Sequence, residues 1–223
     1  MKPLSKYIDH TILKATATKA DIIQLCQEAI QHQFFSVCVN SCYVSLAKAE
    51  LKDSDVKVCS VIGFPLGAMS TIAKVEETKQ ALKDGADEID MVLNIGLLKS
   101  KAFETVFEDI KAVKKVMPNN TLKVILETCY LNNQEINEAS KLAIKAKAEF
   151  IKTSTGFGTS GATIEAVTIM KEAINNGTTK IKASGGIRDT DTALQYINLG
   201  VDRIGTSNGI AIVTGNASGD KNY

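Results

Sequence analysis

The hydrophobic and polar positions of the chain alternate between two periods. Short runs rich in Val, Ile and other sheet-forming residues predict β-strands. Longer segments between them repeat apolar residues every three or four positions, which predicts amphipathic helices. The predicted strands cover residues 34–40, 57–64, 88–94, 122–128, 150–155, 180–184 and 203–206, after a short first strand around residues 7–11.

Two of the intervening segments show the helical period clearly. Their apolar positions are Ile136, Ala139, Ala143 and Ala146 in one segment and Val167, Met170 and Ile174 in the other. Residues at these steps share one face of a helix. Gly85 and Gly200 end two further segments, at the position where a glycine commonly terminates a helix.

Strands and helices that alternate along a chain are typical of βαβ units and a parallel sheet. Eight such pairs fit into 223 residues without a Pro- or Gly-rich linker, which favours a single-domain α/β protein, a TIM (β/α)8 barrel. We expect the barrel to occupy residues 1–212, and residues 213–223 to form a flexible polar tail. A doubly wound open sheet is the alternative, because element order alone does not show closure.

Three helix-to-strand junctions repeat one short pattern. They are "GADEID" (85–90), "KAEFIK" (147–152) and "GVDRIG" (200–205). Each has Ala or Val, then an acid, any residue, Ile and a variable last position. That last position holds Asp90, Lys152 and Gly205 in turn.

The register of this pattern predicts where the side chains point. Successive residues of a strand face opposite sides. If the isoleucines face the helical layer, then Asp90 and Lys152 face the barrel interior. Lys182 ends the similar segment "KIK" (180–182) and would face the same way. The sequence therefore predicts that two lysines and one aspartate converge in one lumen.

This trio predicts amine chemistry. An unperturbed lysine has a pKa of about 10.4 and is almost entirely protonated at pH 7, but burial and a second cation both favour the neutral amine. Lys152 beside Lys182 therefore matches a Schiff-base nucleophile, and Asp90 would accept or donate protons. The structural alternative is that the lysines extend to solvent at the strand ends, or form a buried ion pair without chemistry.

Glycine-rich loops follow the last three predicted strands. They are "STGFGTSG" (154–161), "ASGGIRDT" (183–190) and "GTSNG" (205–209). In TIM barrels, the loops after the seventh and eighth strands commonly bind phosphate through backbone N–H groups. The expected substrate and phosphate contacts are Thr155, Gly156, Gly185, Gly186 and Ser207. The loops lack the spacing of a nucleotide-binding motif, so no nucleotide cofactor is indicated.

Four further residues are candidates for supporting roles: Asp9, Cys38, Lys123 and Tyr223. Asp9 and the adjacent His10 would hold a polar network at the mouth of the barrel. Lys123 and Glu127 share the inward face of the fifth strand and would form a supporting or rim ion pair. Cys38 lies in the middle of a strand, which is more typical of a small buried hydrophobe than of a reactive thiol.

The composition narrows the function further. The formal net charge is +1, with acidic and basic residues mixed, so neither nucleic acid nor a membrane is an expected partner. The five cysteines contain no CxxC pair and are expected to be reduced, as in a cytoplasmic protein. Asp9 and His10 stand where a signal peptide needs apolar residues. With two histidines, no His-rich metal site is expected, and we expect neither a metal nor a cofactor.

Five motifs of the chain are familiar as a set: "YIDHTILK", "EIDMVLNIG", "KVILET", "EFIKTSTGF" and "IKASGGIRD". Together they resemble the deoxyribose-phosphate aldolases, a class I aldolase family with a TIM-barrel fold, in the family's order from about residue 8 to residue 209. The resemblance implies reversible aldol cleavage of 2-deoxy-D-ribose 5-phosphate to acetaldehyde and D-glyceraldehyde 3-phosphate. It also implies that Lys152 forms the Schiff base, Asp90 moves protons and Lys182 is a second catalytic lysine.

The resemblance carries further expectations. It implies a cytoplasmic homodimer or higher homo-oligomer that acts in deoxyribonucleoside catabolism. Some members end in a tyrosine thought to close over the site, a role that would fall to Tyr223. Phe157 departs from the family, because some members carry a lysine near the phosphate at this position. Phosphate binding would then depend more on backbone amides.

Two other functions are compatible with the same residues. Another Schiff-base aldolase or a transaldolase would keep the barrel and the lysine but use a different substrate. A phosphosugar-binding barrel without catalysis would keep the phosphate loops and form no imine. Assays that compare acetaldehyde with dihydroxyacetone donors distinguish the first alternative from a deoxyribose-phosphate aldolase. Imine trapping distinguishes the second, because a non-catalytic barrel would give no trapped adduct.

Overall fold

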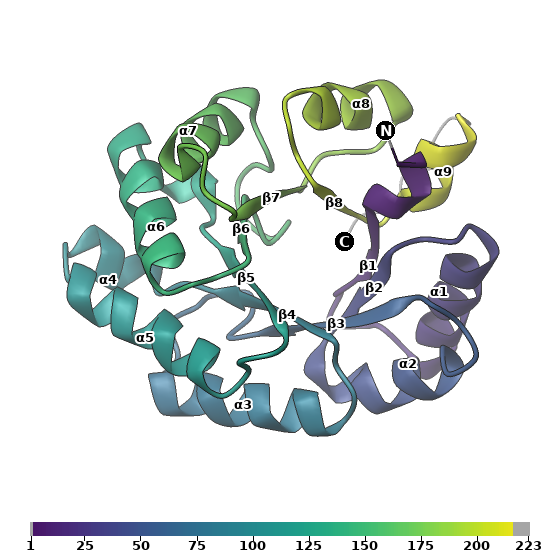
Figure 1. Ribbon diagram of the computed structural model, residues 1–223. Coiled ribbons are helices and arrows are strands. Elements are labelled where there is room, and N and C mark those ends of the chain that lie inside the picture. Colours follow the sequence, from purple (N-terminus) through teal and green to yellow (C-terminus); the bar gives the residue numbers. More distant parts are fainter. Residues whose placement is uncertain (1, 216–223) are drawn as a thin grey trace.

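Eight parallel strands close into a barrel in the computed structural model, which describes residues 2–215 (Figure 1). Each strand pairs with the next one along the chain, and β8 returns to pair with β1. The strands are β1 (Ile8–Ile12), β2 (Ser36–Val39), β3 (Lys57–Ile62), β4 (Glu88–Val92), β5 (Thr121–Ile125), β6 (Phe150–Lys152), β7 (Lys180–Ser184) and β8 (Arg203–Thr206). The closed order confirms the predicted TIM barrel and excludes the open sheet.

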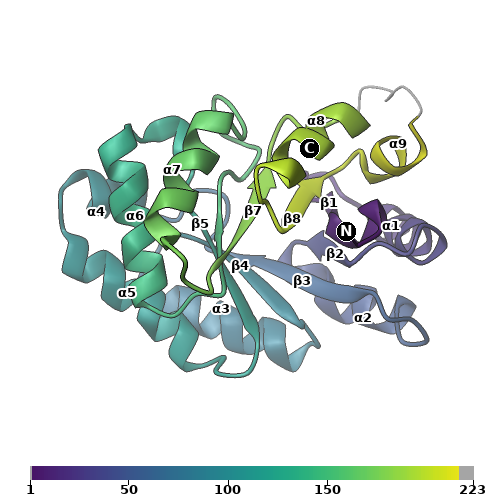
Figure 2. The same cartoon turned by 45° about the horizontal axis from the view of Figure 1, so that its top comes forward.

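Helices follow every strand and surround the barrel on its outside (Figures 1 and 2). They are α1 (Lys19–Gln31), α2 (Val44–Glu50), α3 (Thr71–Lys83), α4 (Ile95–Lys99), α5 (Phe103–Lys115), α6 (Asn133–Lys145), α7 (Ile164–Ile174), α8 (Thr190–Asn198) and α9 (Gly209–Thr214). Three short 3-10 helices are Leu4–Tyr7, Ser41–Tyr43 and Thr128–Tyr130. Within residues 2–215, no helix has both the length and the apolar character needed to traverse a lipid bilayer.

Local sequence signals set the ends of these helices. The Asn132 side chain accepts a hydrogen bond from the Glu135 N–H, and the Glu135 carboxylate accepts the Asn132 N–H in return. This reciprocal pair satisfies backbone donors that the first turn of α6 leaves free. Gly85 and Gly200 follow α3 and α8 with φ of +107° and +101°, which confirms the predicted helix-terminating glycines.

Several strands are shorter than the sequence predicts, mostly at the carboxyl end, although β2 also begins two residues later than predicted. β5 ends at Ile125 and β6 at Lys152, although the prediction extends to residues 128 and 155. Four of these six extra residues are Leu or Thr, which is why the pattern includes them. In the structure they leave the ladder and enter the loops at the mouth of the barrel, and Glu127 turns the chain with a φ of 55°.

The main hydrophobic core lies between the barrel and its helices. Ile89, Ile151 and Ile181 are buried in this layer, as the register predicts. Burial of a side chain of this size stabilises the fold by about 1.5–3 kcal/mol. A smaller apolar cluster in the structure consists of Leu13, Cys38, Cys59 and Val61. These three isoleucines therefore leave the inward face of β4, β6 and β7 to polar side chains.

The carboxyl-terminal region continues from β8 through α9. This helix ends at Thr214, so residues 213 and 214 of the predicted tail are helical. The predictions of a flexible tail and of a role for Tyr223 concern residues 216–223, which lie outside the described residues.

Candidate active site

Asp90 is the centre of the candidate site. It is the third residue of β4 and is fully buried. Its Oδ2 atom lies 2.7 Å from Lys152 Nζ and 2.8 Å from Lys182 Nζ, and its Oδ1 atom lies 2.8 Å from Lys123 Nζ. The structure thus brings together the three residues that the register predicts, with two amines held on one carboxylate oxygen.

Neighbouring strands supply these side chains at matching heights. Lys152 is paired with Lys182 across β6 and β7, and Asp90 with Lys123 across β4 and β5. Gly205 on β8 makes room for one of them, because a Cβ atom there would come within 2.9 Å of Lys182 Cε. This contact explains why the third copy of the repeated junction ends in glycine.

A second carboxylate contacts Lys182 from β1. Asp9 Oδ2 lies 2.6 Å from Lys182 Nζ, and Asp9 Oδ1 lies 2.7 Å from Arg203 Nη1. Arg203 is also 3.4 Å from Glu88, which in turn lies 2.7 Å from Lys123. Glu88 and Arg203 are the first residues of their strands, so this part of the network underlies the site on the amino-terminal side.

The predicted polar network of Asp9 and His10 is wrong in its geometry. The two residues are adjacent in β1 and so face opposite sides of the strand. Asp9 points into the barrel, whereas the Nε2 atom of His10 lies 2.7 Å from Glu28 on α1, outside the strand ring. The same alternation could have identified Glu88 and Arg203 as inward-facing residues, two positions before Asp90 and Gly205.

The predicted ion pair between Lys123 and Glu127 is also wrong. Lys123 pairs with Glu88 and Asp90 instead. Because β5 ends at Ile125 and the backbone turns at Glu127, strand alternation no longer applies to this residue. Its carboxylate accepts hydrogen bonds from the backbone N–H and the hydroxyl of Thr155.

Opposite charges set the protonation of the lumen. Burial alone would raise the pKa of Asp90, but Lys123, Lys152 and Lys182 outweigh it and hold this pKa well below its usual range. Burial would lower the pKa of Lys182, but Asp9 and Asp90 raise it above its ordinary value. The pKa of Lys123 is raised in the same way, against burial and mainly by Asp90. Asp90 is therefore a carboxylate, and Lys123 and Lys182 are cations.

The described part of the lumen holds one basic group more than it has carboxylates. The basic groups are Lys123, Lys152, Lys182 and Arg203, and the carboxylates are Asp9, Glu88 and Asp90. An unbalanced buried charge is costly. Loss of one proton would balance the set.

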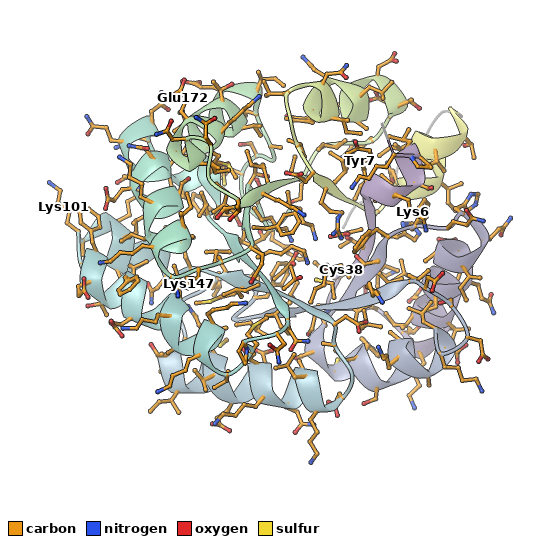
Figure 3. The ribbon with its side chains drawn as sticks, viewed as in Figure 1. Lys6, Tyr7, Cys38, Lys101, Lys147 and Glu172 are labelled. Atoms are coloured by element: carbon orange, nitrogen blue, oxygen red, sulfur yellow. The ribbon has the colours of Figure 1, made fainter. Side chains whose placement is uncertain are left out.

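Two cysteines lie beside Asp90. Cys59 Sγ is 3.0 Å from Asp90 Oδ1, and Cys38 is the register partner of Cys59 on β2. Figure 3 shows Cys38 inside the ring of strands, where it is fully buried. Burial raises the pKa of Cys59 well above its ordinary value, so this thiol stays neutral and donates to Asp90.

The spacing of these groups raises the question of a metal ion. Among the described residues, Cys38, Cys59 and Asp90 are the group whose ligand atoms lie within 4.8 Å of one another. However, lysine nitrogens lie 2.7–2.8 Å from both oxygens of Asp90. A divalent cation at this position would be repelled by the ammonium groups of Lys123 and Lys182. The donor set therefore does not fit a metal centre.

A cavity of about 350 Å³ lies at the carboxyl ends of β6, β7 and β8. It is lined by four of the predicted phosphate contacts, Gly156, Gly185, Gly186 and Ser207, and also by Phe157 and Arg188. Thr155 is not part of this lining, since its hydroxyl bonds to Glu127. The aromatic ring of Phe157 packs edge-on against Phe64, with 5.3 Å between the ring centroids.

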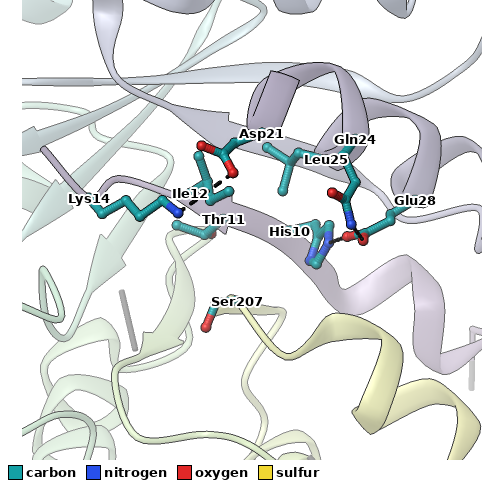
Figure 4. A pocket seen from close by; sticks show the side chains of 9 residues that line it. All are labelled: His10, Thr11, Ile12, Lys14, Asp21, Gln24, Leu25, Glu28 and Ser207. Carbon is teal, nitrogen blue, oxygen red and sulfur yellow. Dashed lines mark hydrogen bonds and ion pairs between the residues drawn. The ribbon is translucent and has the colours of Figure 1, made fainter. Parts of the chain in front are cut away.

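A second cavity of about 240 Å³ is lined by β1, α1 and the loop after β8 (Figure 4). Its polar groups are paired internally, His10 with Glu28 at 2.7 Å and Lys14 with Asp21 at 3.6 Å. Ser207 lines both cavities. The lumen lysines line neither cavity, and the first cavity is the one formed by the loops that directly follow the strands of Lys152 and Lys182.

Comparison with known proteins agrees with this geometry. The family model described as DeoC/LacD family aldolase matches residues 4–221. The chain belongs to the DeoC/LacD aldolase family. A deoxyribose-phosphate aldolase of Finegoldia magna is 54% identical over 212 residues, which cover 95% of this chain and 99% of the relative.

Solved structures of the family superpose closely on this aldolase. One described as QR15, an aldolase, has a TM-score of 0.92 and 44% identity over 96% of both chains. The deoxyribose phosphate aldolase of Aeropyrum pernix, whose structure is described as a unique tetramer, has a TM-score of 0.88 and 31% identity. That match covers 95% of this chain and 89% of the other.

Proposed function

We propose that this aldolase cleaves 2-deoxy-D-ribose 5-phosphate reversibly to acetaldehyde and D-glyceraldehyde 3-phosphate, through an imine on Lys152. The substrate is supported by the near-full-length similarity to the Finegoldia magna deoxyribose-phosphate aldolase. The observation that carries the chemistry is the contact of Lys152 and Lys182 with one oxygen of Asp90 inside the barrel. A neutral amine beside a second cation is an activated nucleophile.

In the proposed reaction, the amine of Lys152 adds to the aldehyde carbon of the open-chain sugar, and water is lost to give an iminium. The hydroxyl on C3 loses its proton, the C2–C3 bond breaks, and the electron pair moves into the iminium. Glyceraldehyde 3-phosphate leaves, and the remaining enamine takes up a proton at C2. Hydrolysis then releases acetaldehyde and regenerates the amine of Lys152.

Asp90 and Lys182 have different roles in this scheme. Asp90 is ionised because its pKa is held well below the usual range by the surrounding lysines, so it accepts the proton of the C3 hydroxyl, directly or through water. Lys182 is a permanent cation, because Asp9 and Asp90 outweigh burial and raise its pKa. Its positive charge favours the neutral form of Lys152.

The substrate phosphate would occupy the cavity lined by Gly156, Gly185, Gly186 and Ser207. Backbone N–H groups of such loops bind phosphate oxygens without a lysine. Phe157 lines this cavity with an apolar ring, which agrees with binding that depends mainly on the backbone. Arg188 also lines it and would add a positive charge.

Reductive trapping tests the proposal. The protein is incubated with acetaldehyde and sodium borohydride, digested and mapped by mass spectrometry. The expected result is an N-ethyl group on Lys152, with the exposed Lys147 (Figure 3) as an internal control for non-specific labelling. A label at another buried lysine, or none, would falsify the assignment, and a preference for dihydroxyacetone donors would indicate a different Schiff-base aldolase. Cleavage activity that survives EDTA is expected.

We also propose that the chain acts in the cytoplasm as a homodimer or larger homo-oligomer. The tetrameric relative from Aeropyrum pernix supports assembly. Two exposed apolar side chains also support it: Leu66, which precedes α3 and is 74% exposed, and Ile72, which lies in α3 and is 76% exposed. The five free thiols suit a reducing compartment. Light scattering after gel filtration tests the assembly, and a monomer mass at assay concentrations would contradict it.

A further inference from the structure

Glu127 has a strained backbone directly after β5. Its φ and ψ of 55° and 62° lie in the left-handed region. For a residue other than glycine, this conformation persists only where surrounding contacts hold it, and it occurs often at functional sites. Glu127 is also 2% exposed, so its carboxylate is buried and has specific partners.

Those partners belong to the loop after β6. Glu127 Oε1 accepts the Thr155 N–H at 3.1 Å, and Glu127 Oε2 accepts the Thr155 hydroxyl. The Thr155 Oγ1 atom in turn accepts the Phe157 N–H at 2.9 Å. A hydrogen-bonded chain therefore leads from the buried carboxylate to the backbone of residue 157.

The next residue of the loop lies directly against the same carboxylate. A Cβ atom at Gly158 would come within 3.2 Å of Glu127 Cδ and 2.5 Å of Cys129 Sγ. A larger residue would require a shift of the loop or of the Cys129 side chain. Together with the bonds to Thr155, this close approach sets the height of residues 155–158 above the end of β5.

These loop residues form one wall of the phosphate cavity. Gly156, Phe157 and Gly158 line it, whereas Glu127 and Thr155 do not. We infer that Glu127 is a positioning residue: it holds residues 155–158 in the geometry that binds the substrate phosphate, without touching the substrate. The inference rests on the proposed function, since it assigns the phosphate to this cavity.

The sign of the effect separates this role from a simple charge effect. A carboxylate beneath a phosphate site repels the phosphate, so removal of the charge alone would tighten binding. Loss of the loop geometry would weaken it. Glutamine keeps the size of Glu127 but replaces one acceptor oxygen by an NH2 donor. It therefore no longer accepts the N–H and the hydroxyl of Thr155 on two separate charged oxygens.

The test compares Glu127→Gln with wild type on 2-deoxy-D-ribose 5-phosphate and on unphosphorylated 2-deoxy-D-ribose. Loss of one hydrogen bond to a charged group changes an equilibrium constant about tenfold. We therefore expect KM for the phosphorylated substrate to rise about tenfold, with little change in kcat. The kcat/KM for deoxyribose should stay near the wild-type value, and inorganic phosphate should inhibit the variant about tenfold more weakly.

Two further variants sharpen the test. Glu149→Gln is the matched control, because Glu149 Oε2 also accepts a backbone N–H, that of Leu122 at 2.9 Å, at the amino-terminal end of the barrel. It should change neither KM. Thr155→Val removes the hydroxyl from the loop side and should reproduce the KM effect. In the double variant with Glu127→Gln, the two effects should be less than additive.

The outcomes distinguish the inference from the proposed function. A lower KM in Glu127→Gln would mean that Glu127 acts through its charge. Equal losses on both substrates would mean a general structural role, and unchanged kinetics would mean no role; each result overturns the inference. If Glu127→Gln does not fold, Thr155→Val decides in the same way. Wild-type protein that fails to cleave deoxyribose 5-phosphate would instead overturn the proposed function.

Discussion

Replacement of Lys182 by methionine should move the pH dependence of catalysis to higher pH. The amines of Lys182 and Lys152 lie 2.8 and 2.7 Å from the same oxygen of Asp90. Lys182 stays protonated, because Asp9 and Asp90 outweigh burial and raise its pKa. Methionine keeps much of the side-chain volume and removes the charge, so a proton on Lys152 is no longer repelled by it. Asp90 is then free to attract that proton more strongly.

The size of the effect follows from the geometry. Two unit charges about 5 Å apart, at the effective dielectric constant of about 20 that suits buried sites, repel each other by about 3 kcal/mol. One pKa unit corresponds to about 1.4 kcal/mol, so the acidic limb of the pH–rate profile should shift upwards by about two units. A shift of about two pH units lowers kcat/KM about 100-fold at a pH on the acidic limb.

The assay is kcat/KM for deoxyribose 5-phosphate cleavage as a function of pH, because this parameter reports ionisations of the free enzyme. The position of the acidic limb is the readout, since Lys182 also affects the height of the plateau. Lys114→Met is the control, because Lys114 pairs with Glu149 at 2.6 Å, outside the lumen network, and should leave the limb unchanged. An unshifted limb in Lys182→Met, or a shift to lower pH, would refute the electrostatic role of Lys182.

Two further predictions concern stability. The pKa of Asp90 and that of Asp9 are held below their ordinary values by neighbouring cations, against burial, so the unfolded chain binds protons below about pH 4 that the folded chain does not. As the pH drops below this value, the free energy of unfolding measured in urea should fall by up to about 1.4 kcal/mol per pH unit for each carboxylate. A free energy of unfolding that does not change with pH would contradict the ionised state of Asp9 and Asp90 in the folded protein. Lys74 on α3 and Asp109 on α5 form a buried ion pair 2.6 Å apart. Lys74→Met should lower the free energy of unfolding by about 3–5 kcal/mol, because it leaves the Asp109 carboxylate buried without its cation. Restoration of stability on adding Asp109→Leu would support this reason, and an unaffected single variant would exclude it.

The convergence of Asp90, Lys152 and Lys182 could be predicted because it depends on local geometry alone. The direction of each side chain follows from strand alternation and from the position of the residue in its strand. In a closed barrel, all inward-facing side chains share one lumen. Glu88 and Arg203 carry the same signal and were missed only because they come at the start of their strands. The strand pattern was thus sufficient to place Asp90, Lys152 and Lys182 on the inward face.

Glu127 could not be placed in this way. Alternation assigns it to the face of Lys123, but the chain turns left-handed before that assignment applies. A non-glycine residue in this conformation is not visible in a hydrophobic pattern. Its partner, Thr155, comes from the next strand's loop, and that pairing depends on how two loops pack. Thr155 was accordingly predicted to contact the substrate, whereas the structure directs its hydroxyl to Glu127.

The distribution of carboxylates distinguishes Lys152, the proposed nucleophile, from the other two buried lysines of the lumen. Burial does not distinguish them, since Lys123, Lys152 and Lys182 are all at most 2% exposed. Lys123 contacts Glu88 and Asp90, and Lys182 contacts Asp9 and Asp90, whereas the ion pairs of residues 2–215 give Lys152 only Asp90. Lys152 is thus the lumen lysine with the fewest carboxylate partners among the described residues. In the proposed reaction, the iminium on Lys152 places a positive charge beside Asp90, whose carboxylate stabilises the intermediate.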